Sequence, residues 1–414
     1  SLIYLFFFYS VHISENGGRF VSTEKRNENF MLKQSRYSKG KKNVKQYSKN
    51  NASKKGGSGK NSYNAYYKKN DDGFQPKSNG KSNYGKKKYP SKSKGYPKKN
   101  AQKPSIKIAF LGGLNEIGKN ITLVECENDI IIIDCGMAFP DGDMLGVDLV
   151  IPDFTYIEQN ADRVKGIILT HGHEDHIGGL PFLLSKVNVP IYGTPLTLGL
   201  VGNKLKEHSL YNQSQLNVIN AGQSIKLGCM KIDFIHVNHS IPDAVAFAIH
   251  TPGGTIVHTG DFKIDCTPIT GDMIDLSSFA RVGDEGVLAL LSESTNAERP
   301  GYTPTERTVS DSLDNLFKSA ENYRIIIATF ASNVNRVQQI IDCAEKYGRK
   351  VAFSGRSMVN YMDVAQKLGY LHLPENILID IDMLDKYMPQ QVVLVTTGSQ
   401  GEPMRSEERR VGKE

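Results

Sequence analysis

Between residues 106 and 300 the chain alternates short apolar runs with polar segments that contain Gly, Asp and His. Short runs rich in Ile, Val and Leu and bounded by such segments are typical of buried β-strands. They occupy residues 130–133, 167–170 and 287–291, and two further runs begin at residues 231 and 254. We predict a strand at each and expect the polar residues behind them to lie at strand ends.

Beyond residue 320 the pattern changes to apolar runs that alternate with amphipathic segments. It predicts strands over 324–329, 351–354 and 392–397, the first of them buried, and helices over 335–347 and 358–368. Alternation of strands and helices is typical of a parallel sheet. The fold class expected from the sequence is therefore α/β.

The segment behind the second run, residues 171–176, reads HGHEDH. A strand that ends just before it would place the first two histidines on the same side of the extended chain, where both can face one metal ion. Asp175 and His176 begin a predicted helix over 177–186 and can reach a second ion roughly 3.5–4 Å away. So dense a cluster favours a metal site over solvated loop histidines.

Two single residues extend this cluster. His239 ends the alternating run that begins at residue 231 and can supply a third nitrogen, and Asp261 ends the strand that begins at residue 254 and can bridge two ions. Alone, each is more often structural, but their order behind the HGHEDH segment favours ligation. The predicted metal ligands are His171, His173, Asp175, His176, His239 and Asp261.

This donor set predicts two divalent metal ions. Imidazole favours zinc, with manganese or magnesium as the alternatives. Such ions lower the pKa of bound water toward about 7 and neutralise charge on a phosphate, as phosphodiester hydrolysis requires. We expect Asp175 both to ligate and to orient the water.

The order of Asp134, the HGHEDH segment, His239 and Asp261 resembles the metallo-β-lactamase superfamily. The flanking sequence is identified as a member of the bacterial ribonuclease J family of β-CASP nucleases, over residues 106–404. The resemblance rests on GGLNEIGKN at 112–120, VNHSIPD at 237–243, HTGDFK at 258–263, SESTN at 292–296, ASNVNR at 331–336, GRSM at 355–358 and GSQGEP at 398–403.

The resemblance implies a metallo-β-lactamase αββα sandwich with an inserted β-CASP α/β domain, incomplete here. It implies RNA cleavage, both endonucleolytic and 5′-to-3′ exonucleolytic, in RNA processing and mRNA decay. Asp134 would support a ligating histidine, and Glu293, the acidic residue of the first β-CASP motif, would orient another catalytic group. The expected catalytic residues are Asp134, Asp175, His176 and Glu293.

Three polar loops follow strands of the predicted parallel sheet, whose loops gather at one edge and bind ligands there. Helix capping by Ser and Asn is the alternative. The resemblance favours RNA contacts near a 5′-monophosphate, which helix N-termini and arginines can bind. The candidate RNA-binding residues are Ser332, Asn333, Arg336, Gly355, Arg356, Ser357, Ser399, Gln400, Gly401 and Glu402.

Charge is distributed very unevenly along the chain. Residues 31–105 hold 22 Lys or Arg against two acidic residues, a net charge of +20. Since the whole chain carries +7 and residues 1–30 are neutral, residues 106–414 carry −13. The basic segment also holds eight tyrosines, which favours a disordered tether for single-stranded RNA. A solvating linker, or a tail that docks on acidic proteins or anionic lipid, is the alternative.

We expect five segments. Residues 1–30, which contain no Met, and residues 405–414, which depart from the family pattern, read as non-native translation. Residues 31–105 form the basic tail, 106–304 the metallo-β-lactamase domain and 305–404 a partial β-CASP domain. By the resemblance, later histidines, including a last metal ligand, lie beyond this chain, so the fragment itself is expected to be weak or inactive.

Five cysteines without CxxC pairs favour the cytoplasm. No run approaches the roughly 20 apolar residues of a membrane span, so we expect no membrane partner. The resemblance suggests a homo-oligomer, or a hetero-oligomer with a paralogue, within an RNA-decay complex. Two other functions stay open: a non-catalytic RNA-binding subunit of such a complex, and a small-molecule metallo-hydrolase.

Overall fold

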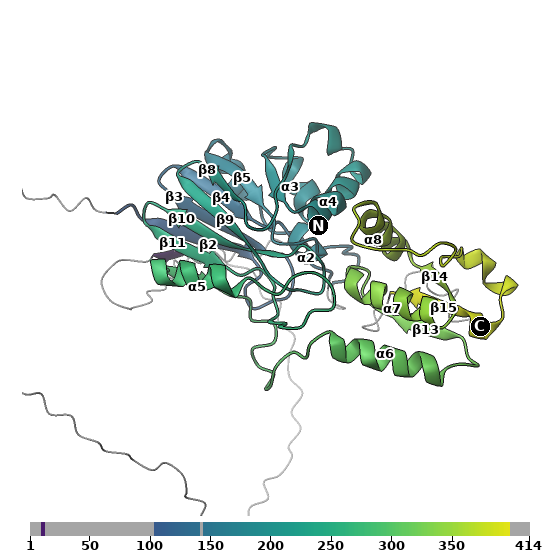
Figure 1. Ribbon diagram of the computed structural model, residues 1–414. Coiled ribbons are helices and arrows are strands. Elements are labelled where there is room, and N and C mark those ends of the chain that lie inside the picture. The colour runs from purple at the N-terminus through teal and green to yellow at the C-terminus, as the bar shows by residue number, and fades with distance from the viewer. Residues whose placement is uncertain (1–9, 13–102, 141–143, 398–414) are drawn as a thin grey trace, which may run out of the picture. The chain divides into compact units, whose positions relative to one another are not determined.

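The computed structural model describes residues 10–12, 103–140 and 144–397 (Figure 1). Two sheets pack face to face within this part of the chain. The first has the order β1-β2-β3-β4-β5-β6-β7, antiparallel up to β4 and parallel from β4 to β7. Its strands are β1 (Ser10–His12), β2 (Ile106–Gly112), β3 (Ile121–Cys126), β4 (Asp129–Ile133), β5 (Val164–Ile168), β6 (Ile191–Gly193) and β7 (Leu216–Val218).

The second sheet has the order β12-β11-β10-β9-β8 and is antiparallel except for the parallel pair β11 and β12. Its strands are β8 (Ser224–Leu227), β9 (Met230–His236), β10 (Val245–Thr251), β11 (Gly254–His258) and β12 (Ala289–Leu291). Helices cover the outer faces of both sheets, with α3 and α4 on one side and α5 on the other (Figure 1). This is the expected αββα sandwich.

Strand β4 begins with the half-buried Asp129 and continues with four isoleucines that do not alternate with polar residues. Ile131 and Ile133 pack between the two sheets, whereas Ile130 and Ile132 face the helices on the outside of the first sheet. A strand buried on both faces leaves no position for a polar side chain. The next polar residue, Asp134, therefore comes directly after the strand.

The helices and 3₁₀-helices of the sandwich are short apart from α4 and α5. They are α1 (Thr155–Gln159), η1 (Ala161–Arg163), α2 (Glu174–Ile177), α3 (Leu180–Leu184), α4 (Pro195–Glu207), η2 (Tyr211–Gln213) and α5 (Leu276–Glu285). The single helix predicted over 177–186 is wrong, because Gly178 and Gly179 separate α2 from α3. A Cβ at Gly179 would lie 2.6 Å from the carbonyl oxygen of Gly136, so this turn requires glycine, and Pro181, which has no amide hydrogen, stands at the start of α3.

A three-stranded parallel sheet of order β13-β15-β14 follows, as the alternating pattern predicted. Its elements are α6 (Arg307–Ser319), β13 (Ile325–Ala328), α7 (Val334–Lys346), β14 (Lys350–Ser354), α8 (Arg356–Lys367), η3 (Ile381–Lys386), η4 (Pro389–Gln391) and β15 (Val392–Thr396). The predicted burial of the first strand is wrong. β13 lies at the sheet edge, and Ile326 is 57% exposed.

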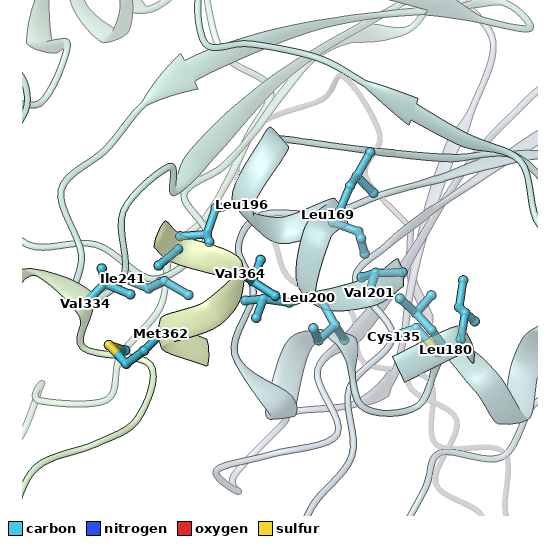
Figure 2. Packing of buried hydrophobic residues seen from close by; sticks show 14 of the residues in the cluster. Cys135, Leu169, Leu180, Leu196, Leu200, Val201, Ile241, Val334, Met362 and Val364 are labelled. Atoms are coloured by element: carbon cyan, nitrogen blue, oxygen red, sulfur yellow. The ribbon is translucent and has the colours of Figure 1, made fainter. Parts of the chain in front are cut away.

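Helix α8 packs against α4 of the sandwich. Gly199 permits this approach, since a Cβ there would lie 2.8 Å from Cγ1 of Val364. Figure 2 shows side chains from both parts in one apolar cluster, among them Leu196, Leu200, Ile241, Val334, Met362 and Val364. In the residues that the structure describes, we find no helix that is both long and apolar enough for a membrane span.

Gly136 is the tightest packing point near the strand ends, and we predict that Gly136→Ala is strongly destabilising. A Cβ at this position would lie 1.6 Å from the carbonyl oxygen of Asp175. Backbone displacement of that kind should lower the free energy of unfolding by about 3 kcal/mol, as measured by urea denaturation. Gly283→Ala, within α5 and with no atom within 4 Å of the added Cβ, should raise it slightly. Equal effects of the two substitutions would contradict the packing described.

Candidate metal centre

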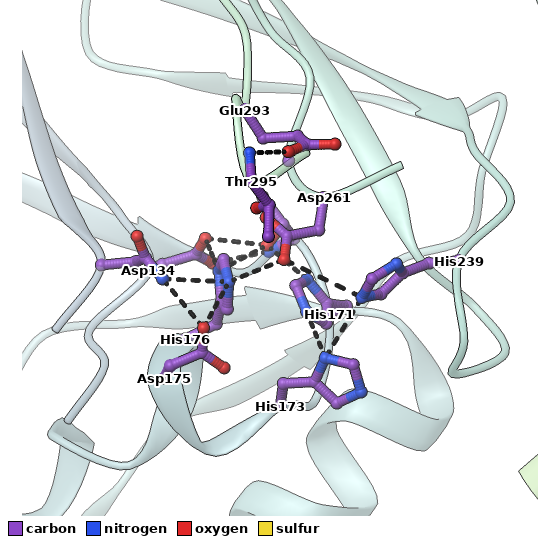
Figure 3. Close-up of polar contacts among 12 residues, drawn as sticks. Asp134, His171, His173, Asp175, His176, His239, Asp261, Glu293 and Thr295 are labelled. Atoms are coloured by element: carbon purple, nitrogen blue, oxygen red, sulfur yellow. Dashed lines mark hydrogen bonds and ion pairs between the residues drawn. The ribbon is translucent and has the colours of Figure 1, made fainter. Parts of the chain in front are cut away.

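The predicted ligands converge at the ends of strands (Figure 3). His171 and His173 follow β5, His176 lies in α2, His239 follows β9 and Asp261 follows β11. Strands from both sheets thus deliver donors to one place, although the donors are up to 90 residues apart in the sequence. The geometric convergence predicted from the order of the motifs is present.

Three imidazoles form the first group of donors. His171 Nε2 lies 2.9 Å from His173 Nδ1, which in turn lies 3.2 Å from His239 Nε2. Burial lowers the pKa of His171 well below its usual range, that of His173 to about 3 and that of His239 to about 4. All three rings are therefore neutral at pH 7 and present lone pairs to a common point, as a zinc-like cation requires.

The second group consists of His171, His176 and Asp261, each with one donor atom within 4.8 Å of the other two. Asp261 Oδ2 lies 3.6 Å from His176 Nε2 and 3.9 Å from His239 Nε2. This oxygen stands between the two groups, where a bridging carboxylate would be. Burial raises the pKa of Asp261, but the hydrogen bond and the charge of His176 outweigh burial and lower this pKa overall. Asp261 is therefore ionised at neutral pH.

Asp175 lies near the second group of donors but belongs to neither group. Its Oδ2 lies 3.4 Å from His176 Nε2. Burial raises the pKa of Asp175, but the hydrogen bond and charge of His176 outweigh this and lower it overall. An anionic oxygen therefore faces the centre, and direct ligation by Asp175 stays a prediction.

Asp134 holds His176 from behind. It is 1% exposed, and its two oxygens accept hydrogen bonds from the Thr170 amide and hydroxyl, both at 2.7 Å. Asp134 Oδ2 also lies 2.8 Å from His176 Nδ1. Burial lowers the pKa of His176, but the Asp134 carboxylate raises it well above its usual range. Contact at Nδ1 leaves Nε2 directed at the donor groups, which supports the role expected of Asp134.

Asn120 is a site residue that the sequence analysis did not single out. Its Nδ2 lies 3.1 Å from both Asp175 Oδ2 and His176 Nε2. Its backbone amide also donates to the carbonyl of Asp175 at 3.0 Å. Asparagine carries no charge and ends a glycine-rich loop far from the histidines in sequence, so residue type gave no signal.

Glu293 lies beyond β12 and contacts its own loop. Its Oε2 accepts a hydrogen bond from the Thr295 amide at 2.7 Å, and its own amide contacts Thr259 Oγ1 at 3.2 Å (Figure 3). These contacts fix the loop beside Asp261. A role for Glu293 in orienting another catalytic group stays a prediction.

The loops predicted to bind RNA lie behind the parallel strands β13 and β14, hence at one edge of the sheet. Within them, Asn333 caps α7, since its side chain accepts from the Arg336 amide at 3.1 Å. Ser332 precedes that cap, and Gly355 precedes Arg356 and Ser357, the first residues of α8. The candidates Ser399, Gln400, Gly401 and Glu402 lie outside the described residues.

The Arg336 guanidinium forms an ion pair with Glu306 at 2.8 Å. Its charge is therefore paired within the protein and is not reserved for a phosphate. Helix capping thus accounts for Asn333, and an intramolecular ion pair accounts for the Arg336 head group. RNA contact by the loop residues remains a prediction.

Comparison with known proteins agrees with this geometry. Residues 114–300 match the family described as Metallo-beta-lactamase superfamily, and residues 322–413 match "Ribonuclease J, beta-CASP domain". Residues 114–300 therefore form a domain of the metallo-β-lactamase superfamily. Residues 322–413 form a β-CASP domain of the ribonuclease J type, as the sequence motifs indicated.

Several curated relatives are similar over about three quarters of this chain. Ribonuclease J of Helicobacter pylori is 48% identical over 73% of the chain and 44% of its own length. Ribonuclease J2 of Bacillus subtilis is 44% identical over 76% of the chain and 56% of its own length. Ribonuclease J of Mycobacterium tuberculosis is 48% identical over 72% of the chain and 53% of its own length. The chain spans about half the length of these relatives.

Among solved structures, a protein of unknown function from Enterococcus faecalis matches with a TM-score of 0.55 at 17% identity, over 75% of this chain and 84% of that one. At so low an identity the match supports the fold alone.

We predict that Asp134→Asn weakens zinc binding by about 10- to 100-fold, because the amide has one acceptor oxygen where the carboxylate has two and His176 loses its orientation. Competition with a chelating dye measures the affinity. Asp129→Asn is the matched control, since Asp129 is the carboxylate at the other end of β4 and accepts from the Cys229 amide at 2.7 Å. The same loss of affinity in both variants would show that Asp134 has no special role.

Proposed function

We propose that the protein is a metal-dependent ribonuclease that hydrolyses phosphodiester bonds of RNA. The main observation that supports this proposal is that two donor groups share His171 and that the Asp261 carboxylate lies between them. This arrangement suits two closely spaced cations, which is a common solution for phosphodiester cleavage. The names of the relatives, each a ribonuclease J, support RNA as the substrate.

Two divalent cations would be held by His171, His173 and His239 on one side and by His176, Asp261 and Asp175 on the other. Zinc is proposed, because neutral imidazoles predominate in the donor set, with manganese or magnesium as alternatives. When bound, such cations supply hydroxide at neutral pH and neutralise charge on the scissile phosphate.

The chain's own residues prepare this chemistry. Asp134 fixes the ring of His176 through Nδ1, so that Nε2 stays directed at the centre. The Asn120 amide holds Asp175 Oδ2, which keeps an ionised oxygen next to His176. We propose that Asp175 accepts a proton from the attacking water, since its carboxylate is ionised and its side chain is 32% exposed, against 26% for Asp261 and 2% for Asp134.

The finer activity is proposed from the family. It comprises 5′-to-3′ exonucleolytic digestion of single-stranded RNA with a 5′-monophosphate, together with endonucleolytic cutting. It would serve RNA processing, including that of rRNA, and mRNA decay in the cytoplasm. The protein is proposed to act as a homo-oligomer or with a paralogue in an RNA-decay complex.

The direct test uses the protein extended to the length of its relatives. We expect it to release mononucleotides from 5′-monophosphate RNA in the presence of zinc or manganese, and to act more slowly on 5′-triphosphate RNA. His173→Ala, which removes one of three converging nitrogens, should reduce the rate by at least about a hundredfold. Chromatography of the products distinguishes mononucleotides from internal fragments.

Absence of metal-dependent cleavage of either RNA would overturn the nuclease proposal. RNA binding without cleavage would favour a non-catalytic subunit, and turnover of a lactam or thioester instead would favour a small-molecule hydrolase.

The basic segment 31–105 generates a second prediction, on RNA affinity. Lysines that neutralise phosphates release counterions, which makes binding depend steeply on salt. Deletion of residues 31–105, with net charge +20, should weaken binding of single-stranded RNA and flatten the plot of log affinity against log salt concentration. An unchanged slope, measured by fluorescence anisotropy, would favour a linker.

A further inference from the structure

Three loops carry most of the donors of the metal centre, and each of them is tied by a polar contact to residues after 305. Tyr361 of α8 donates its hydroxyl to the carbonyl of Gly172 at 3.1 Å. Gly172 stands between the ligands His171 and His173. A displacement of this one carbonyl would therefore move two imidazoles.

The loop that carries His239 has a contact of the same kind. Tyr370, just behind α8, donates its hydroxyl to Asp243 Oδ2. The same oxygen accepts from the amide of Leu196, at the start of α4, at 3.1 Å. Asp243 thus links the segment behind His239 to both α4 and the α8 region.

The loop that carries Asp261 is held by an ion-pair network. Glu306 accepts from Lys263 Nζ at Oε1 and from Arg336 Nη2 at Oε2, each at 2.8 Å. The Glu306 amide donates to Asp265 Oδ2 at 3.1 Å. Lys263 and Asp265 stand two and four residues behind Asp261. Arg336, a candidate for RNA contact, is therefore part of a connection to the metal loop.

Close apolar packing between α4 and α8 accompanies these polar contacts. Gly199 brings α4 against Val364 of α8, and a Cβ at Gly172 would lie 2.7 Å from Leu200 Cδ1 of α4. The Gly172 loop is thus held between α4 on one side and the Tyr361 hydroxyl on the other. Figure 2 shows the apolar part of this arrangement, with Leu200 and Val364 in the same cluster.

We propose that Tyr361, Tyr370 and Glu306 with Arg336 are positioning residues for the metal centre, so that the β-CASP part of the chain sets the metal affinity of the metallo-β-lactamase part. The inference rests on the metal centre proposed above. Ligand distances must match the cation within about 0.2 Å, so a loop that relaxes by a few tenths of an ångström loses affinity.

The test compares Tyr361→Phe with Tyr347→Phe in the 414-residue chain. Both variants lose only a hydroxyl, and Tyr347 donates to the Asp314 carbonyl at 3.3 Å and carboxylate at 3.1 Å, away from the metal loops. We expect Tyr361→Phe to weaken zinc binding about tenfold, by chelating-dye competition, and Tyr347→Phe to leave it unchanged. Thermal unfolding without metal should be lowered similarly in both, which separates positioning from general stability.

Glu306→Gln tests the positioning role independently, because its amide offers one acceptor oxygen to the two cations, Lys263 and Arg336, that pair with Glu306. It should weaken zinc binding several-fold as well. Equal zinc affinity in wild type, Tyr361→Phe and Glu306→Gln would overturn the positioning role and leave the metal centre standing. A wild-type chain that binds no zinc, manganese or magnesium would overturn both.

Discussion

The buried carboxylate of Asp134 is the contact on which the metal centre depends. A charge 1% exposed at the end of β4 is costly unless hydrogen bonds satisfy it, and here the Thr170 amide and hydroxyl and His176 do so. These contacts join the end of β4 to the end of β5. The first sheet therefore fixes both the start of the HGHEDH segment and the direction of its last histidine.

The remaining donors come from the second sheet and are held from outside the sandwich. His239 and Asp261 follow β9 and β11, and their loops contact Tyr370 and Glu306 of the later part of the chain. Since the donor atoms of each group lie within 4.8 Å of one another, small shifts between the elements would disperse them. Joint support from two sheets and from α8 explains how polar, partly buried loops keep a fixed arrangement.

Strands β4, β5, β9, β11 and β12, the α/β class, the parallel sheet and the convergence of the ligands followed from local pattern and motif order, because burial on both faces of β4 and β5 leaves a clear signature. The other strands of the sandwich were not predicted. Four features did not follow. The exposure of β13 depends on its place at the sheet edge, and the need for glycine between α2 and α3 depends on the approach of the chain behind β4. The role of Asn120 and the pairing of Arg336 with Glu306 depend on contacts 55 and 30 residues apart, which no local pattern contains.

The central claim is that two cations bind at the shared donor groups. Anomalous diffraction at the zinc absorption edge, from crystals grown with zinc, tests it most directly. The account predicts two peaks roughly 3.5–4 Å apart, one beside His171, His173 and His239 and the other beside His176, with Asp261 between them. No peak among these residues, or zinc bound elsewhere in the protein, would contradict it.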